Sequence, residues 1–457
     1  MISGEAQAPA RGEGMPANAD RVPVAALVGI FLLALALRLA AIVFVGPSPD
    51  FTGYSESGLT AANLAQGWGY KYDFYGLRQA NPLQAFMPPL FVGLVYLCLK
   101  FSANPPLMFA LAQALLSSVT CLAIYWLAVE LSRKRTVALL AALGVACYPV
   151  LILMVTVPAS LTLHLAVLSW ALAFTAPLAR RSSVGYALAA GVLWGVMGLG
   201  RPAMLAFLPC ILLWLTLNRD ASRRWLRDGI VMIAAAALIV VPWTIRNAAV
   251  LGRFVPVATN GGFVFWNGNN PFTTGSGHDV YTDKASQFLG RPVDAKLPAV
   301  MQWQPYPLPS DIQRQVEALP ETELDRRLLQ AGLDYMRQEP RAWVALLGRK
   351  LVAFWWFREN LGAAYEGSWT RYYRPLYVLT LGLTVAGLAL SLGQWRRYSL
   401  LYLFFGLTAV TYIAFEVLTR FRWEIEPFFL VFAALAVATL ASRLVVRFHR
   451  NASPVST

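Results

Sequence analysis

The sequence has few charged residues, few histidines and few cysteines. Of its 457 residues only 14% are Asp, Glu, Lys or Arg, and there are three histidines and four cysteines. Soluble domains carry about 25% charged residues, so this composition excludes an ordinary soluble domain. No group of His, Cys, Asp and Glu has the spacing of metal ligands. We therefore predict no cofactor; a divalent metal is compatible with the sequence but is not implied by it.

The cysteines lie inside apolar stretches, and none is placed where a disulfide outside a membrane could form. They are Cys98, Cys121, Cys147 and Cys210. His164 also lies in an apolar stretch. We expect all five to be residues of a packed core rather than ligands or reactive groups.

Apolar residues, in contrast, make up 57% of the chain and occur in long blocks. A helix needs about 20 apolar residues to cross a bilayer, and many of the blocks approach or exceed this length. We therefore predict an all-α polytopic membrane protein with about ten crossings. The predicted crossings are residues 24–45, 105–131, 136–157, 160–178, 184–200, 203–217, 229–245, 375–393, 399–418 and 426–444.

Two further apolar stretches are poorer candidates for crossing. Residues 86–101 are short, and residues 342–357 carry Arg349 and Lys350 at their centre. A pair of charges at mid-bilayer is costly. We expect both stretches to lie at the membrane surface; full insertion would raise the number of crossings to eleven or twelve.

Clusters of basic residues set the orientation. The net charge is +14, but the arginines and lysines occur in short groups between apolar blocks. This is the positive-inside pattern of membrane proteins, and we predict no nucleic-acid partner. The clusters fall within residues 133–135, 180–181, 219–227, 396–397 and 443–450.

This orientation divides the chain into consecutive regions, and no internal repeat is apparent. We expect a helix at 54–66 in the first outer loop and another near 321–338 in the second. The predicted regions are a disordered cytoplasmic tail (1–22), a membrane core (23–245) that includes a first outer loop (47–85), a large outer loop (246–340), C-terminal membrane helices (341–445) and a cytoplasmic tail (446–457).

Several motifs lie at the predicted outer ends of the membrane helices. They are PDFTGY at 49–54, PPL at 88–90, GRP at 200–202, PWTIRN at 242–247 and GNNP at 268–271. In these motifs the sequence resembles the GT-C superfamily of integral-membrane glycosyltransferases. Within it, the sequence is most similar to family 39, which includes protein O-mannosyltransferases and lipid A aminoarabinose transferases. Three features depart from the family pattern: Phe51 replaces a second acid, Met87 replaces a lysine that some relatives have, and an acid often found in the second outer loop is missing around residues 157–160.

The resemblance implies a sugar donor linked to a polyprenyl phosphate, transfer on the outer face of the membrane and inversion at the anomeric carbon. A phosphate leaving group needs no proton. One base for the acceptor hydroxyl, with cations for the departing phosphate, would therefore suffice. Asp50, at the edge of the first outer loop, is the base that we predict. The alternative is that Asp50 caps the helix that follows it.

Cations at or near the outer ends of helices are the predicted ligands of the donor phosphate. They are Arg38, Arg78, Arg201, Arg246 and Lys350. Arg38 lies within an apolar span, where an unpaired charge is costly. Arg201 and Arg246 lie at the depth of a lipid headgroup. The alternative for each is an anchor at the membrane interface.

Polar and aromatic residues of the two outer loops are predicted to line a substrate cleft. They are Tyr54, Glu56, Asn260, Trp266 and Asn269. Amide side chains hydrogen-bond to hydroxyl groups, and aromatic faces stack on sugar rings. In the alternative interpretation Tyr54 packs on the membrane domain, Glu56 is a solvated acid and the Gly/Asn-rich run is an ordinary turn.

Together these interpretations predict a glycosyltransferase that moves a hexose or pentose from a polyprenyl phosphate to an acceptor hydroxyl. The acceptor is an unidentified glycan, lipid or protein. We expect the protein to lie in the inner membrane of a cell, among membrane lipids, with its active site on the periplasmic side. The alternative is a lipid or glycan transporter or flippase. Transporters usually have repeated halves and polar helices at the midplane, whereas here the polar residues concentrate in two unequal outer loops.

Overall fold

The computed structural model describes residues 23–218, 224–275, 308–356 and 368–452. Within these ranges the chain is helical, and its only β pairing is a single bridge between Tyr72 and Leu83. The predicted all-α fold is therefore confirmed. The predicted disordered tail at 1–22 lies outside the described residues.

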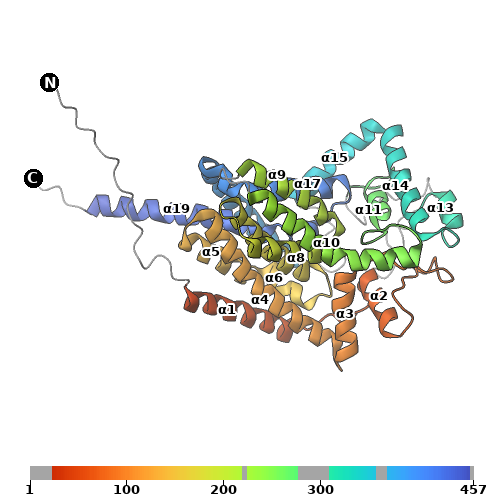
Figure 1. The fold of residues 1–457 in the computed structure, drawn as a ribbon. Helices are drawn as coiled ribbons and strands as arrows, with labels where there is room; N and C mark the ends of the chain where they lie inside the picture. Colours follow the sequence, from red (N-terminus) through yellow and green to blue (C-terminus); the bar gives the residue numbers. More distant parts are fainter. Residues whose placement is uncertain (1–22, 219–223, 276–307, 357–367, 453–457) are drawn as a thin grey trace, which may run out of the picture.

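The long helices run side by side as a bundle (Figure 1). Helix α1 (Val24–Val45) begins, and α19 (Glu426–Ala452) ends, at the left of the view. Short helices gather at the right, among them α2 (Glu56–Ala65) and α11 (Gly261–Gly268). We call the side of the bundle with α2 and α11 the site end.

Each of the ten predicted crossings is helical, although several helices start or stop a few residues away from the predicted limits. By length and composition six helical stretches could cross a membrane, or seven with the bent pair that follows α4. Besides α1 and α19 these stretches comprise α4 (Pro105–Ser132), α5 (Arg135–Ala146) with α6 (Pro149–Leu153) and η2 (Met154–Thr156), α7 (Leu161–Thr175) with η3 (Ala176–Ala179), α10 (Arg224–Leu251), and α16 (Ser368–Ser391) with η7 (Leu392–Gln394) and α17 (Trp395–Ala414). Two further helices of the bundle, α8 (Val184–Gly200) and η4 (Pro202–Ala206) with α9 (Phe207–Asn218), are apolar but shorter.

Helices α16 and α17 are two crossings rather than one. Tyr373, near the start of α16, accepts a hydrogen bond from Arg422, and Tyr412, near the end of α17, donates one to Glu424. Both ends of the 372–414 stretch thus return to the same short segment. The three-residue turn η7 reverses the chain between them.

The elements at the site end are shorter and more polar. They are α2, α3 (Pro89–Phe101), α11, α13 (Ser310–Gln315), α14 (Glu321–Gln338), α15 (Pro340–Trp355) and α18 (Thr419–Arg422). In Figure 1 α3 lies across the direction of α1. This orientation agrees with the surface position predicted for residues 86–101. The helix predicted near 321–338 coincides with α14.

Small residues allow the membrane helices to approach closely. A Cβ atom added to Gly195 of α8 would lie 2.7 Å from the carbonyl oxygen of Ala236 on α10. A Cβ added to Gly387 of α16 would collide with the carbonyl oxygen of Phe432 on α19. Helices in a membrane associate largely through such close packing. Both glycines therefore hold pairs of helices that frame the site end.

Three predicted boundaries need correction. Helix α10 continues to Leu251, beyond the predicted end of the span at residue 245, and α19 continues to Ala452, through most of the predicted tail. Helix α2 begins at Glu56 rather than near residue 51 or 54, because Ser55 caps it by accepting a hydrogen bond from the Gly58 N–H at 3.2 Å.

Candidate functional site

The predicted base, Asp50, lies in a loop that is fixed to the membrane helices on both sides. The Ser48 N–H donates to the carbonyl oxygen of Thr156 at 2.9 Å. Phe51 is buried and packs edge-to-face on Phe109, with the ring centroids 5.3 Å apart. The apolar cluster around Phe51 also includes Leu163 of α7. The loop is therefore held where α4 and α7 begin.

Asp50 itself is exposed. Its Oδ1 accepts a hydrogen bond from the Gly53 N–H at 2.9 Å, so Asp50 closes a tight turn ahead of α2. Because Ser55 caps α2, the alternative reading of Asp50 as the N-cap of that helix is wrong. Among the described residues no cationic nitrogen lies within 4.0 Å of the carboxylate. Its second oxygen has no hydrogen-bond partner among the described residues.

Glu56, the first residue of α2, connects this loop to the last part of the chain. Its Oε1 accepts a hydrogen bond from the Tyr75 hydroxyl at 2.5 Å. Its negative charge also raises the pKa of Glu416, which follows α17. The first outer loop and the segment after α17 are thus neighbours at the site end. Tyr54, two residues earlier, is half-buried.

Arg201 forms a two-point ion pair with Glu424. Nη1 of Arg201 lies 2.7 Å from Oε2 of Glu424, and Nη2 lies 2.5 Å from Oε1. The Tyr412 hydroxyl donates to the same Oε2 at 2.7 Å. Burial raises the pKa of Glu424 to about 6, although Arg201 and Arg420 favour its charged form. Arg201 therefore lies at the site end with its charge largely matched by Glu424, and its contact with the donor phosphate stays a prediction.

The segment between α17 and α19 contributes two more charged groups. Arg420 is exposed, and in the part of the chain that is described no carboxylate lies within 4.0 Å of it. Its positive charge favours the ionised forms of both Glu416 and Glu424 and so lowers their pKa values. Burial raises the pKa of Glu416 to about 7, against the effect of Arg420 and Lys350. Arg420 is thus a cation with unused donors beside two buried acids.

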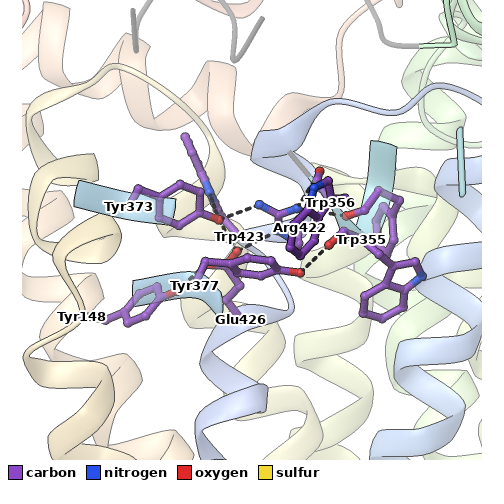
Figure 2. Close-up of polar contacts among 9 residues, drawn as sticks. Tyr148, Trp355, Trp356, Tyr373, Tyr377, Arg422, Trp423 and Glu426 are labelled. Atoms are coloured by element: carbon purple, nitrogen blue, oxygen red, sulfur yellow. Dashed lines mark hydrogen bonds and ion pairs between the residues drawn. The ribbon is translucent and has the colours of Figure 1, made fainter. Parts of the chain in front are cut away.

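A buried ion pair anchors this segment (Figure 2). Nε of Arg422 lies 3.0 Å from Oε1 of Glu426, and both side chains are fully buried. Tyr148 donates to Oε2 of Glu426 at 2.6 Å, and the Tyr373 hydroxyl also donates to Glu426. The guanidinium of Arg422 lies 3.8 Å from the ring centroid of Tyr377. These contacts tie the segment to α6 and α16, which fixes the positions of the neighbouring Arg420 and Glu424.

Arg246 keeps the features of a phosphate ligand. Its guanidinium lies 4.9 Å from the ring centroid of Trp243 and 5.2 Å from that of Tyr70. Nη1 donates to the carbonyl oxygen of Gln84 at 2.6 Å and to Oδ1 of Asn247 at 3.0 Å. Nη2 and Nε have no acceptor among the residues described. The side chain is half-buried, so these donors are held in place by the two rings and remain open to a ligand.

Arg38 has a structural role and not the predicted phosphate contact. It is fully buried in α1. Nε donates to Oγ of Ser117 at 2.7 Å, and Nη1 donates to the carbonyl oxygens of Ala34 at 3.0 Å and Ala146 at 2.9 Å. Nη2 donates to the carbonyl oxygen of Val145 at 3.3 Å. The guanidinium therefore joins α1, α4 and α5, and no donor is directed to the site end.

Arg78 has a structural role as well. Only 1% of it is exposed, and it donates to the carbonyl oxygens of Asn81, Val316 and Leu319. Because these acceptors belong to the first loop and to the stretch after α13, Arg78 holds the two outer segments together. It has no side facing a lipid phosphate.

Lys350 and Asn269 form a buried pair, which also differs from their predicted contact with substrate. Nζ of Lys350 donates to Oδ1 of Asn269 at 3.1 Å and to the carbonyl oxygen of Phe415 at 2.7 Å. Nδ2 of Asn269 donates to the carbonyl oxygens of Ala414 at 2.9 Å and Phe415 at 3.3 Å. Both side chains are fully buried. They clamp the backbone that leads to Glu416.

The two remaining predicted cleft residues, Trp266 and Asn260, differ in how deeply they are buried. Trp266 is 3% exposed and packs edge-to-face on Phe272, so it belongs to the core of the outer segment and not to an open surface. Asn260 is half-buried, and its Nδ2 lies 3.9 Å from Sδ of Met87. Asn260 therefore borders the end of the first outer loop, and its contact with substrate stays a prediction.

His164 is a core residue, as predicted, but it lies at the site end without a hydrogen-bond partner. It is 3% exposed, and neither ring nitrogen has a partner in the described chain. A Cβ added to Gly200 would lie 2.6 Å from its Nε2, and Arg201 follows Gly200. No group of three or more His, Cys, Asp or Glu suited to a metal occurs within the described ranges.

The sequence reasoning missed Glu416, Arg420 and Glu424. All three lie around the turn between the last two predicted crossings, 399–418 and 426–444. The predicted topology already placed this turn on the outer side. Arginines in a short outer turn run against the positive-inside pattern, so Arg420 and Arg422 are the signal in the sequence that could have directed attention to this turn.

Comparisons with known proteins agree with this architecture. Residues 85–245 match the family model described as dolichyl-phosphate-mannose-protein mannosyltransferase. A search of characterised protein sequences found no significant match.

Solved structures of similar fold include the oligosaccharyltransferase AglB from Archaeoglobus fulgidus. Its complex with an inhibitory peptide and a dolichol-phosphate is 13% identical, with a TM-score of 0.51, and the match covers 95% of this chain and 52% of AglB. The form tethered to an acceptor peptide containing the NVT sequon is 15% identical, with a TM-score of 0.54, and the match covers 93% and 50%. This chain thus spans about half the length of AglB.

ArnT from Cupriavidus metallidurans bound to undecaprenyl phosphate is 15% identical, and the match covers 95% of this chain and 82% of ArnT. Its TM-score is 0.42. The family model and the AglB structures confirm the predicted resemblance in fold.

Proposed function

We propose that this protein, which has the fold of the GT-C membrane glycosyltransferases, transfers a sugar from a polyprenyl-phosphate donor to an acceptor hydroxyl. One observation supports this proposal most strongly. The exposed carboxylate of Asp50 lies at the same end of the bundle as Arg201, Arg246 and Arg420. A base and a group of cations at one membrane surface are what transfer from a lipid phosphate requires.

In the proposed reaction the acceptor oxygen attacks the anomeric carbon from the face opposite the phosphate. The bond between that carbon and the phosphate oxygen breaks, and its electron pair stays on the phosphate. The acceptor proton passes to the carboxylate of Asp50 and later to solvent. The configuration at the anomeric carbon is inverted, and the second product is a polyprenyl phosphate.

Arg246 and Arg420 are the residues that we assign to the departing phosphate. Both retain N–H donors that no described acceptor uses, and the rings of Tyr70 and Trp243 hold Arg246 in place. Charge-assisted hydrogen bonds of arginine to phosphate are stronger than neutral ones. They would stabilise the negative charge that develops on the leaving group.

The rest of the proposal concerns location and acceptor. We place the site end on the periplasmic face of a bacterial-type inner membrane, because basic clusters such as 133–135 and 396–397 lie between apolar helices as the positive-inside pattern requires for the cytoplasmic side. A hexose or a pentose on the lipid, and a glycan, lipid or protein as acceptor, are compatible with the site.

Substitution of Asp50 by Asn tests the proposal. Oδ1 of the amide can still accept the Gly53 N–H, so the turn and the fold should persist. Loss of a general base lowers the rate about 10²- to 10⁴-fold. In cells of the source organism that lack the native protein, D50N should therefore fail to consume the donor. Mass spectrometry of extracted lipids should show a polyprenyl-phosphate sugar accumulating.

The control is Glu323→Gln, which removes a partly exposed acid on α14 that pairs with Arg326 and Arg327. Cells with E323Q should have the lipid profile of the wild type. A transporter or flippase would work normally with the D50N substitution. Normal lipids in cells with D50N, together with accumulation in cells that lack the protein, would therefore favour the transporter.

A further inference from the structure

The backbone just after α17 is held from two sides. Nζ of Lys350 and Nδ2 of Asn269 both donate to the carbonyl oxygen of Phe415, at 2.7 and 3.3 Å. Gly268 allows this approach, because a Cβ there would collide with the same oxygen and lie 3.0 Å from the Cα of Glu416. Lys350, Asn269 and Gly268 thus fix the position of the backbone that leads into Glu416.

The side chain of Glu416 has none of the partners expected of a buried acid. Only 6% of the residue is exposed. Within the described chain its carboxylate makes no hydrogen bond and no ion pair within 4.0 Å. Its oxygens are not among the fully enclosed polar atoms that lack a partner in the described chain, so they remain accessible to a small ligand. The network around Glu426 shows that this fold satisfies a buried glutamate fully when its role is structural.

The charges around Glu416 indicate which kind of ligand would satisfy it. Arg420 and Lys350 lie near enough to favour its charged form, and Glu56 of the first outer loop lies near enough to disfavour it. A second anion would be repelled by two carboxylates. A ligand that supplies hydroxyl hydrogens would be favoured, because an ionised carboxylate can only accept hydrogen bonds.

We infer that Glu416 is a substrate-binding carboxylate that accepts hydrogen bonds from hydroxyl groups of the transferred sugar. The inference rests on the proposed function and deepens it. Asp50 then faces the acceptor, Arg246 and Arg420 hold the phosphate, and Glu416 orients the sugar between them. Lys350 acts as a positioning residue, because it holds the carbonyl group of Phe415 that precedes Glu416.

The test compares Glu416→Gln and Glu416→Asp with D50N, wild type and the E323Q control, each expressed in cells that lack the native protein. A hydrogen bond to a charged group contributes enough to change binding about 10- to 100-fold. We expect cells with E416Q to accumulate the same polyprenyl-phosphate sugar as cells with D50N. E416D keeps the charge and should lower the accumulation relative to E416Q.

The melting temperature of each purified protein in detergent separates binding from folding. Because the wild-type carboxylate has no hydrogen-bond or ion-pair partner among the described residues, E416Q should melt at the same temperature as the wild type or higher. A structural acid would give the opposite result. Wild-type lipid levels in cells with E416Q, or accumulation accompanied by a lower melting temperature, would overturn the inference.

The two proposals fail in different ways. Accumulation with D50N but not with E416Q would leave the transferase proposal standing and remove the role of Glu416. Accumulation with neither variant would contradict the transferase proposal, and the inference about Glu416 with it.

Discussion

Arg201, at the C-terminal end of α8, and Glu424, which precedes α19, are joined by two short hydrogen bonds although 223 residues separate them. Only 19% of the arginine side chain and 3% of the glutamate side chain are exposed. The guanidinium also lies 5.6 Å from the ring centroid of Tyr412. This pair connects the first and last parts of the membrane domain at the site end.

Breaking this pair should destabilise the protein strongly. Removing one partner of a buried ion pair leaves an uncompensated charge and costs about 3–5 kcal/mol. We therefore expect Arg201→Met and Glu424→Gln each to lower the melting temperature in detergent. The double variant should recover part of the loss, because neither charge then remains alone. Additive losses in the double variant would show that the two residues act independently.

Arg246 should contribute to binding of the lipid phosphate rather than to folding. Arg246→Ala should weaken binding of dolichol phosphate about 10- to 100-fold, as expected for hydrogen bonds to a charged group. The affinity of Arg246→Lys for dolichol phosphate should lie between those of the wild type and Arg246→Ala. Lysine keeps the charge but loses the planar guanidinium and its stacking on Trp243 and Tyr70. Native mass spectrometry with increasing dolichol phosphate measures both.

The matched control for Arg246 is Arg253→Ala, which removes an exposed arginine from the turn that follows α10. It should bind dolichol phosphate as the wild type does. Equal weakening in both variants would mean that overall positive charge, and not the position of Arg246, governs binding.

Glu416 should make the stability of the wild type fall as the pH rises. Its pKa is about 7 in the folded protein and 4.5 in the unfolded chain, so the folded state holds the proton more tightly. Below pH 4.5 both states are protonated and the burial cost is absent. As the pH rises through 7, the unfolded chain ionises first and folding loses about 3 kcal/mol.

Glu416→Gln removes this dependence while Arg420, Lys350 and Glu56 remain. The melting temperature of E416Q minus that of the wild type should therefore increase between pH 5 and pH 8, by a few degrees. Scanning fluorimetry across this range measures the difference. A constant difference would show that Glu416 keeps its ordinary pKa in the folded protein.

Gly268 should be intolerant of any side chain. The added methyl group of Gly268→Ala would meet the carbonyl oxygen of Phe415 and displace the segment that carries Glu416. Overpacking of this kind costs about 1–3 kcal/mol, and donor consumption should fall more than tenfold if Glu416 binds the sugar. Gly261→Ala is the control on the same helix, because no atom lies within 4 Å of its added Cβ. Similar donor levels and melting temperatures for the two variants would contradict this prediction.

Much of the fold follows from the sequence, because each apolar block had to become a helix in a bilayer. The blocks at 24–45 and 105–131 coincide closely with α1 and α4. Helix lengths were predicted less well where the apolar pattern of the sequence does not mark the end of a helix. Helix α10 continues six residues past residue 245 because its PWTIRN run remains helical, with Pro242 inside the helix.

The candidate site was predicted only in part. Asp50 lies in a loop at the site end and Arg201 at the end of a helix there, because the apolar blocks set where the helices end and the positive-inside pattern predicts which ends share a side. Whether an arginine faces a ligand or a backbone carbonyl depends on tertiary contacts, and these decided the roles of Arg38 and Arg78. Glu416 is buried by α11 and α15, which are distant in sequence, so no local pattern could reveal it.

The contacts of Arg38 also bear on how the protein is assembled. Its acceptors beyond α1 are Ser117 on α4 and the carbonyl oxygens of Val145 and Ala146 at the end of α5. During translation those groups are synthesised roughly a hundred residues after Arg38. Until then the unpaired charge of Arg38 makes insertion of α1 into lipid costly. The first helix therefore attains its final surroundings only when the hairpin that follows it has arrived. The final position of α1 therefore depends on helices that are synthesised after it.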